Sequence, residues 1–326
     1  MHVLVLGAAG MLGRKLVARL AAEGLGGRPV DVLTLVDVVP PAEPAGFAGR
    51  VEARAGDLSV PGVAEACVAA RPDVVFHLAA VVSGEAEADM DKGYRVNLDG
   101  TRLLLEALRA GHVASGGAWR ARVVFTSSLA VFGTPLPGVI GDEFLSAPLS
   151  SYGTQKAIGE LLLADYSRRG FVDGVGLRLP TICVRPGLPN RAASGFFSGI
   201  IREPLAGKEA VLPVGEEVRH WFASPRAAVA FLLRAGACDL GVLGGRRSLT
   251  MPGLSVSVAE QIEALRRVAG DKAVALIRRE RDPAVERIIE TWPQAFDTQR
   301  ARAMGFEAEG SFEEIIRVYL EDDAPK

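Results

Sequence analysis

The chain has 326 residues, 49% of them hydrophobic, and its 37 basic residues nearly balance its 39 acidic ones. A net charge of −2 lacks the basic excess of nucleic-acid-binding proteins, so we expect no nucleic-acid partner. The start lacks the basic and apolar regions of a signal peptide, and no apolar run reaches the length of a membrane span. We therefore expect a cytoplasmic protein without a membrane partner.

Apolar strands and amphipathic helices alternate along the first part of the chain. The continuous apolar run His2–Leu6 predicts a strand buried on both faces, and Met11–Glu23 has helical spacing. The two patterns then recur, as strands at Val32–Val36, Val51–Ala55, Val74–Leu78, Val123–Ser127 and Val175–Leu179 and as helices at Gly62–Arg71, Tyr94–Ala110 and Tyr152–Arg169. This alternation predicts an α/β fold with a doubly wound parallel sheet.

The pattern weakens after about Pro180. Pro186, Pro189, Asn190 and Gly195 indicate an irregular loop. Helical spacing returns at Val256–Gly270 and Phe312–Glu321. We expect this remainder to form a smaller C-terminal lobe of mixed α/β structure.

A glycine-rich turn, Gly7-Ala8-Ala9-Gly10-Met11-Leu12-Gly13, joins the first strand to the first helix. Gly7 permits the tight turn, Gly10 lets the backbone approach a pyrophosphate, and Gly13 lets the helix pack closely on the strand. The free amides of the helix N-terminus, around Met11 and Leu12, can then bind the phosphates. The turn therefore predicts a dinucleotide-binding site.

An acidic residue, Asp37, follows the second strand. A carboxylate there accepts hydrogen bonds from ribose hydroxyls and repels a 2′-phosphate, which indicates NAD rather than NADP. Asp57 and Leu58 follow the third strand, and we expect them beside the adenine. Asp57 could equally cap a helix.

The Gly-x-x-Gly-x-x-Gly spacing resembles the extended short-chain dehydrogenase/reductase family. Further matching segments are His77-Leu78-Ala79-Ala80, Asn97, Thr126-Ser127-Ser128 with Val131-Phe132-Gly133, and Tyr152-x-x-x-Lys156. The resemblance implies a Rossmann fold. It also implies a cofactor site that includes Leu78, Ala79, Ala80, Asn97, Ser127, Tyr152, Lys156 and Pro180.

Tyr152 and Lys156 are four residues apart and share one face of a helix. A nearby ammonium favours the phenolate, so that Tyr152 can remove an alcohol proton while hydride leaves for NAD. Lys156 would also hold the nicotinamide ribose. Ser128 would hold the reacting oxygen, with Ser127 as the adjacent alternative; the family resemblance favours Ser128.

The positions where related dehydratases carry acids are Leu129 and Ala130 here, which argues against dehydration. A nucleotide-sugar epimerase with tightly bound NAD stays possible, whereas nothing suggests a noncatalytic NAD-binding protein. The segments 81–87, 177–182, 185–190, 193–197 and 219–221 resemble family members that oxidise small sugar acids. That resemblance implies oxidation of the C2 hydroxyl of a four-carbon sugar acid to a 2-keto acid.

An acid substrate needs a cation for its carboxylate, and the candidates are Arg185, Arg191 and Arg219. Each could equally form a surface ion pair. Ser83 and Thr181, with Ser128 and Tyr152, could bind the hydroxyls. His220 could contact substrate or be a buried, hydrogen-bonded histidine, and Trp221 fits a core position better than a binding platform.

We expect residues 1–182 to form the NAD-binding Rossmann domain, to which about 216–250 returns, and 183–326 mainly the substrate-binding lobe. The three cysteines, Cys67, Cys183 and Cys238, match neither a disulfide framework nor a metal site, so we expect free thiols and no metal. The family resemblance also implies a homodimer formed through the helices Tyr94–Ala110 and Tyr152–Arg169.

Overall fold

A computed structural model describes residues 1–187 and 194–324, and the chain divides into two units. Unit 1 comprises Met1–Val131, Ser150–Arg178 and Val229–Leu249; unit 2 comprises Phe132–Leu149, Leu179–Ala228 and Thr250–Lys326. The segment 132–149 belongs to unit 2, although the sequence placed it in the first domain. It has no apolar periodicity that would have marked the change of unit.

Unit 1 is built on a parallel sheet. Among the described residues, seven strands form this sheet in the order β10-β6-β5-β4-β1-β2-β3. The pairs β1–β2, β1–β4, β2–β3 and β4–β5 run parallel. The bounds are β1 His2–Leu6, β2 Val32–Asp37, β3 Arg50–Ala55, β4 Val74–His77, β5 Arg122–Ser128, β6 Asp173–Leu179 and β10 Ser248–Thr250. The predicted α/β fold with a doubly wound sheet is confirmed.

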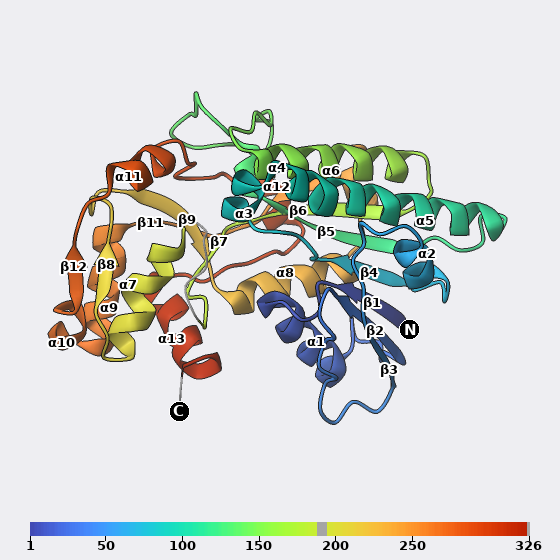
Figure 1. Cartoon of the computed structure of the whole chain (residues 1–326), viewed down its shortest axis with the longest axis horizontal. Coiled ribbons are helices and arrows are strands. Elements are labelled where there is room, and N and C mark those ends of the chain that lie inside the picture. Colours follow the sequence, from blue (N-terminus) through green and yellow to red (C-terminus); the bar gives the residue numbers. More distant parts are fainter. Residues whose placement is uncertain (188–193, 325–326) are drawn as a thin grey trace. The chain divides into compact units, whose positions relative to one another are not determined.

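Helices cover both faces of this sheet. Val75 of β4 packs in one apolar cluster with side chains of α2 (Val63–Val68), α5 (Gly100–Ala114) and α6 (Ser151–Arg168). Its neighbour Phe76 points to the opposite face, where Gly236 of α8 (Pro225–Ala237) comes so close that a Cβ would lie 2.8 Å from the ring. The helices α5 and α6 lie side by side (Figure 1).

The predicted helix at Tyr94–Ala110 is two elements in the structure. A π-helical segment, η1 (Tyr94–Asp99), precedes α5, which continues to Ala114. Periodicity cannot separate a π-helical turn from an α-helix over so few residues. The remaining elements of this unit are α1 Met11–Glu23, α3 Ser83–Ala88, α4 Met90–Gly93, η2 Leu129–Val131 and η3 Gly241–Leu243.

Unit 2 has mixed α/β structure, as predicted. The strand β9 pairs antiparallel with β11 and parallel with β7, and β12 pairs with β8. One apolar core includes Phe197, Phe222, Ile262 and Ile315. The bounds are β7 Thr181–Ile182, α7 Gly195–Leu205, β8 Ala210–Leu212, β9 Arg219–Ala223, β11 Leu254–Ser257, α9 Val258–Ala269, α10 Asp271–Val274, β12 Ile277–Arg279, α11 Pro283–Ile289, α12 Gln299–Ala303 and α13 Phe312–Asp322.

Candidate functional site

The glycine turn between β1 and α1 is a close-packed piece of bare backbone. Gly7 has a φ of +86°, and its N–H donates to Val36 O at 2.8 Å. A Cβ at Gly13 would lie 2.1 Å from Gly7 O, and a Cβ at Gly7 would lie 2.7 Å from Ala79 N. The N-cap residue of α1 is Gly10, which has no side chain to occupy the first-turn amides. Backbone donors at an uncapped helix N-terminus fit the diphosphate of a dinucleotide.

Asp37 ends β2 directly beside this turn. Its carboxylate accepts hydrogen bonds from Ala9 N at 2.9 Å and from Val38 N at 2.7 Å. The backbone of the glycine turn and the carboxylate that follows β2 are therefore joined. This arrangement fits the ribose next to a diphosphate.

Asp57 stabilises a turn rather than a helix. Its carboxylate accepts hydrogen bonds from the N–H and the hydroxyl of Ser59, at 2.9 and 2.7 Å, while α2 begins later, after Gly62. Leu58 is buried and lies next to Gly100. A Cβ added at Gly100 would be 3.4 Å from the Cβ of Leu58. Their positions beside the adenine stay predictions.

Asn97 links the segment after β4 to helix α6. It is 2% exposed, and its Oδ1 accepts from Val81 N at 2.9 Å. Its Nδ2 donates to Val81 O at 3.2 Å and to Gln155 Oε1 at 2.8 Å. The segment containing Leu78, Ala79 and Ala80, which follows β4 and lies against Gly7, is thus tied to the helix that carries Tyr152 and Lys156.

Lys156 is buried beneath the half-buried Tyr152 on α6. Its Nζ donates to Thr126 O at 2.8 Å and lies 4.8 Å from the Phe125 ring and 5.7 Å from the Tyr152 ring. Burial lowers the pKa of Lys156, and the negative charge of Glu160 acts in the opposite direction. The pKa that results is about 7. The structure thus brings together the predicted Tyr–Lys pair.

The two candidate serines at the end of β5 have different surroundings. The Ser127 hydroxyl is buried and donates to Glu160 Oε1 at 2.5 Å. Ser128 is half-buried, and its Oγ accepts a hydrogen bond from Ala130 N at 3.2 Å. This contact does not use the hydroxyl proton of Ser128, which can be donated to another acceptor.

Sequence reasoning missed the buried partners beneath these residues. Glu160 forms an ion pair with Arg178 of β6 and also accepts from Ser127. The signal was present, because Glu160 follows Lys156 by four residues and therefore lies on the same helix face.

In unit 2, the half-buried Thr181 and the buried His220 form a hydrogen-bonded pair. The His220 Nδ1–H donates to Pro293 O at 2.9 Å, so its Nε2 accepts from Thr181 Oγ1 at 2.7 Å. Burial lowers the pKa of His220 to about 4, and its ring stacks on Phe197. Trp221 is buried and donates to Met251 O. His220 therefore matches the expectation of a buried, hydrogen-bonded histidine.

The candidate arginines of unit 2 already have partners. Arg185 donates from Nε to Ile182 O and from its guanidinium to Ser194 Oγ, both at 2.9 Å. Arg219 donates to Ser255 O and forms an ion pair with Glu260 at 2.9 Å.

Other predicted residues lie in both units. The half-exposed Ser83 is the first residue of helix α3 in unit 1, and Pro180 is buried in unit 2. Arg191, Pro189, Asn190 and Ala193 lie outside the described residues.

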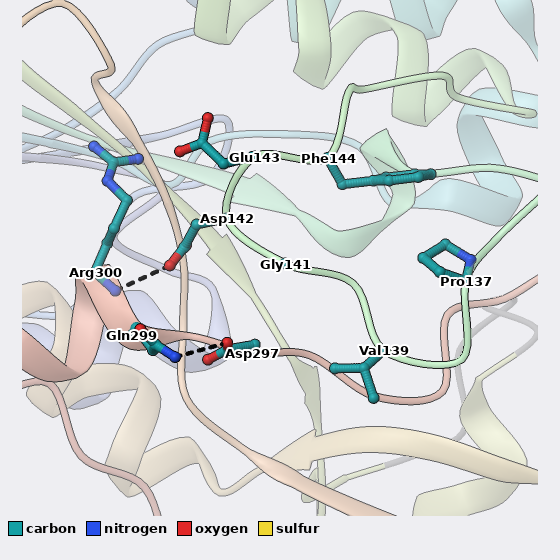
Figure 2. Close-up of a pocket in the computed structure, with 9 residues that line it drawn as sticks. All are labelled: Pro137, Val139, Gly141, Asp142, Glu143, Phe144, Asp297, Gln299 and Arg300. Atoms are coloured by element: carbon teal, nitrogen blue, oxygen red, sulfur yellow. Dashed lines mark hydrogen bonds between the residues drawn. The ribbon is translucent and has the colours of Figure 1, made fainter.

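Unit 2 also carries a cavity of about 630 Å³ (Figure 2). Within it Asp142 accepts from Arg300 N at 2.9 Å, and Gln299 donates to Asp297 at 3.0 Å. The lining residues are Pro137, Val139, Gly141, Asp142, Glu143, Phe144, Asp297, Gln299 and Arg300. None of the predicted site residues is among them, so we assign no part of the reaction to this cavity.

Across the described part of the chain, no group of three or more His, Cys, Asp or Glu side chains could hold a metal ion. Cys67 and Cys183 are buried free thiols, and Cys238 is a half-buried one. In residues 1–187 and 194–324, none of the helices combines the length and the apolar character that crossing a bilayer requires.

Comparison with known proteins identifies relatives over the whole chain. The model of the NAD dependent epimerase/dehydratase family matches residues 3–243. A D-erythronate dehydrogenase of Cupriavidus necator is 53% identical over 328 residues, covering 99% of this chain and 98% of that protein. One from Haemophilus influenzae is 41% identical over 323 residues, covering 99% of this chain and all of that protein.

A solved structure is also similar throughout. The crystal structure described as the nucleoside-diphosphate-sugar epimerase from Agrobacterium tumefaciens is 64% identical, with a TM-score of 0.96. The alignment covers 99% of this chain and 94% of that one. These relatives are thus named after two different activities, the dehydrogenation of D-erythronate and the epimerisation of nucleoside-diphosphate sugars.

Proposed function

The chain belongs to the NAD-dependent epimerase/dehydratase family, and we propose that it oxidises the C2 hydroxyl of D-erythronate to a ketone, giving 2-dehydro-D-erythronate. The observation that carries this proposal is the end-to-end identity of 53% and 41% to two D-erythronate dehydrogenases. The chain is thus an NAD-dependent oxidoreductase that acts on a CH–OH group.

We propose Tyr152 as the base. NAD, when bound, supplies the nicotinamide that accepts a hydride. The hydroxyl proton of the substrate passes to the Tyr152 phenolate, and the C2 hydrogen leaves with its electron pair as that hydride, so the alcohol becomes a ketone. The Lys156 ammonium stabilises the phenolate, which the distance of 5.7 Å between its Nζ and the Tyr152 ring supports.

Ser128 is proposed to donate to the reacting oxygen and hold it near the phenol. The contrast between the neighbouring serines supports this choice, because the Ser127 hydroxyl is buried and donates to Glu160. The Ser128 Oγ accepts a hydrogen bond from Ala130 N, and this contact does not use its proton. Ser83 is proposed to bind a substrate hydroxyl, while the roles of Thr181, Arg185 and Arg219 in binding the substrate stay predictions.

The proposed cofactor residues are Gly7, Gly10, Met11, Leu12, Gly13 and Asp37, with Asn97 and Lys156. The open first turn of α1 supports a diphosphate there, and the carboxylate beside Ala9 supports a ribose. In this arrangement Asp37 excludes a 2′-phosphate by charge.

Asp37→Asn should shift cofactor preference toward NADP. The amide keeps the size of the side chain and removes the charge that repels the 2′-phosphate, so the ratio of the Kd values for NADP and NAD should fall on the order of tenfold or more. Titration calorimetry with both cofactors measures it. Asp31→Asn, just before the opposite end of β2, is the matched control and should leave the ratio unchanged. An unchanged ratio in Asp37→Asn would refute the role of Asp37.

The substrate is tested by NADH absorbance with free sugar acids of three to six carbons, with NAD and NADP in parallel. We expect NADH from D-erythronate and none from UDP-sugars. Failure with every acid of the panel would eliminate the proposal.

A nucleotide-sugar 4-epimerase is the second candidate, favoured by the name of the 64% identical structure. It requires NAD that stays bound through purification. Isomers of a UDP-sugar would interconvert without net NADH. The same panel, analysed for both NADH and isomers, distinguishes the two activities.

The family resemblance also implies a homodimer through α5 and α6, which we retain as a proposal. Apolar side chains on these helices that a second copy could cover are Leu161, which is 72% exposed, and Val113, which is 58% exposed. The cytoplasmic location stays a prediction.

A further inference from the structure

Glu160 is a buried carboxylate that the reaction described above does not use. It lies one helical turn after Lys156 on α6 and is 5% exposed. Arg178 of β6 contacts both of its oxygens, from Nε to Oε1 at 2.9 Å and from the terminal nitrogen to Oε2 at 2.6 Å. Ser127 of β5 donates to Oε1 at 2.5 Å. Because two neighbouring strands hold this carboxylate, its negative charge has a fixed position.

The carboxylate of Glu160 contributes to the charge balance around Lys156, which lies one helical turn earlier on the same face of α6. Burial disfavours the ammonium, and the carboxylate of Glu160 opposes that effect. On the adjacent strand β4, burial and the charge of Lys156 lower the pKa of His77 to about 3, so His77 is neutral near pH 7. Arg178 is bound to Glu160 itself. Among the described residues, the Lys156 amine also contacts Thr126 O and the rings of Phe125 and Tyr152.

We propose that Glu160, held in place by Arg178 and Ser127, is a positioning residue that keeps the Lys156 amine charged beside Tyr152. The catalytic meaning of this inference rests on the proposed function. Without the negative charge of Glu160, the buried amine releases its proton at lower pH. The Tyr152 phenolate then lacks its cation and forms only at higher pH.

Glu160→Gln removes the negative charge, while the amide keeps the shape of the side chain and an oxygen for Ser127. The rising limb of kcat/KM against pH, measured for the oxidation, should move up by about one unit. The rate near pH 7 should fall about tenfold, with recovery at high pH. Asp165→Asn, an exposed carboxylate of the same helix paired with Arg168, is the matched control and should leave the limb in place.

A second readout uses the protein without cofactor. The chain has four tyrosines, so the Tyr152 step is obtained by subtracting the tyrosinate absorbance titration of Tyr152→Phe from that of each variant. Glu160→Gln should move this step to higher pH. A shifted step together with no activity on any sugar acid would contradict the proposed function and support this inference. An unchanged step would overturn the inference.

Glu160→Gln leaves the Arg178 guanidinium without its carboxylate, which can impair folding. The double variant Glu160→Gln/Arg178→Met removes both charges, and the methionine fills the space of the arginine with an apolar side chain. Its limb should move in the same direction by a smaller amount, since the positive charge of Arg178 is lost as well. A folded double variant whose rate falls equally at every pH would show a purely structural role and overturn the inference.

Discussion

Tyr152→Phe is expected to lower turnover by about 10²- to 10⁴-fold, the range that general acid–base catalysis contributes. The substitution removes only the hydroxyl, so the ring still packs at the start of α6 and the Lys156 Nζ keeps its bond to Thr126 O. The Kd for NAD should therefore stay close to that of the wild type. Steady-state NADH production and cofactor titration measure the two quantities.

The matched control for this substitution is Tyr166→Phe on the same helix. The Tyr166 hydroxyl donates to Glu106 of α5, so the control makes the same chemical change at a site far along α6 from the base. It should turn over normally. Undiminished turnover in Tyr152→Phe would rule out this tyrosine as the base.

Gly13→Ala is expected to raise the Kd for NAD by about tenfold or more and to lower the melting temperature by several degrees. The new methyl would lie 2.1 Å from Gly7 O and 2.8 Å from Ala8 Cα, so the backbone of the turn must move. Forcing extra atoms into such a packed place costs about 1–3 kcal/mol. Thermal unfolding and NAD titration of the purified variant measure both effects.

Gly245→Ala supplies the control within the same unit. A Cβ there meets nothing within 4 Å, so stability and NAD affinity should stay at wild-type values. If Gly13→Ala bound NAD as tightly as Gly245→Ala does, the glycine turn would not be the phosphate site.

The sheet and its helices could be predicted because burial leaves a periodic signal. The bounds of β1 and α1 in the structure, His2–Leu6 and Met11–Glu23, are those of the sequence prediction. The helices α3 and α4 have six and four residues, too few for a period to be visible. Much of unit 2 was missed for a related reason, since strands such as β7, with two residues, are set by tertiary pairing.

The candidate site was predictable where chemistry and spacing coincide. Tyr152 and Lys156 lie on one helix, and a separation of four residues brings them to one face. The contacts of Glu160 with Arg178 and Ser127 join residues 18 and 33 positions apart, which no local spacing reveals. Likewise, Asp57 stabilises a local turn through Ser59, and its acidic character alone could not distinguish that from a helix cap.

The amide of Asn97 joins the segment after β4, through Val81, to α6, through Gln155, by hydrogen bonds within the protein itself. This wall of the site is therefore preorganised, and an arriving dinucleotide loses little conformational entropy in ordering it. To join these two segments, a single short side chain must accept one hydrogen bond and donate two. An ionised aspartate has the same size but no donors, and it would set its charge against the oxygens of Val81 and Gln155. Asparagine is the side chain of this length that satisfies all three partners at once.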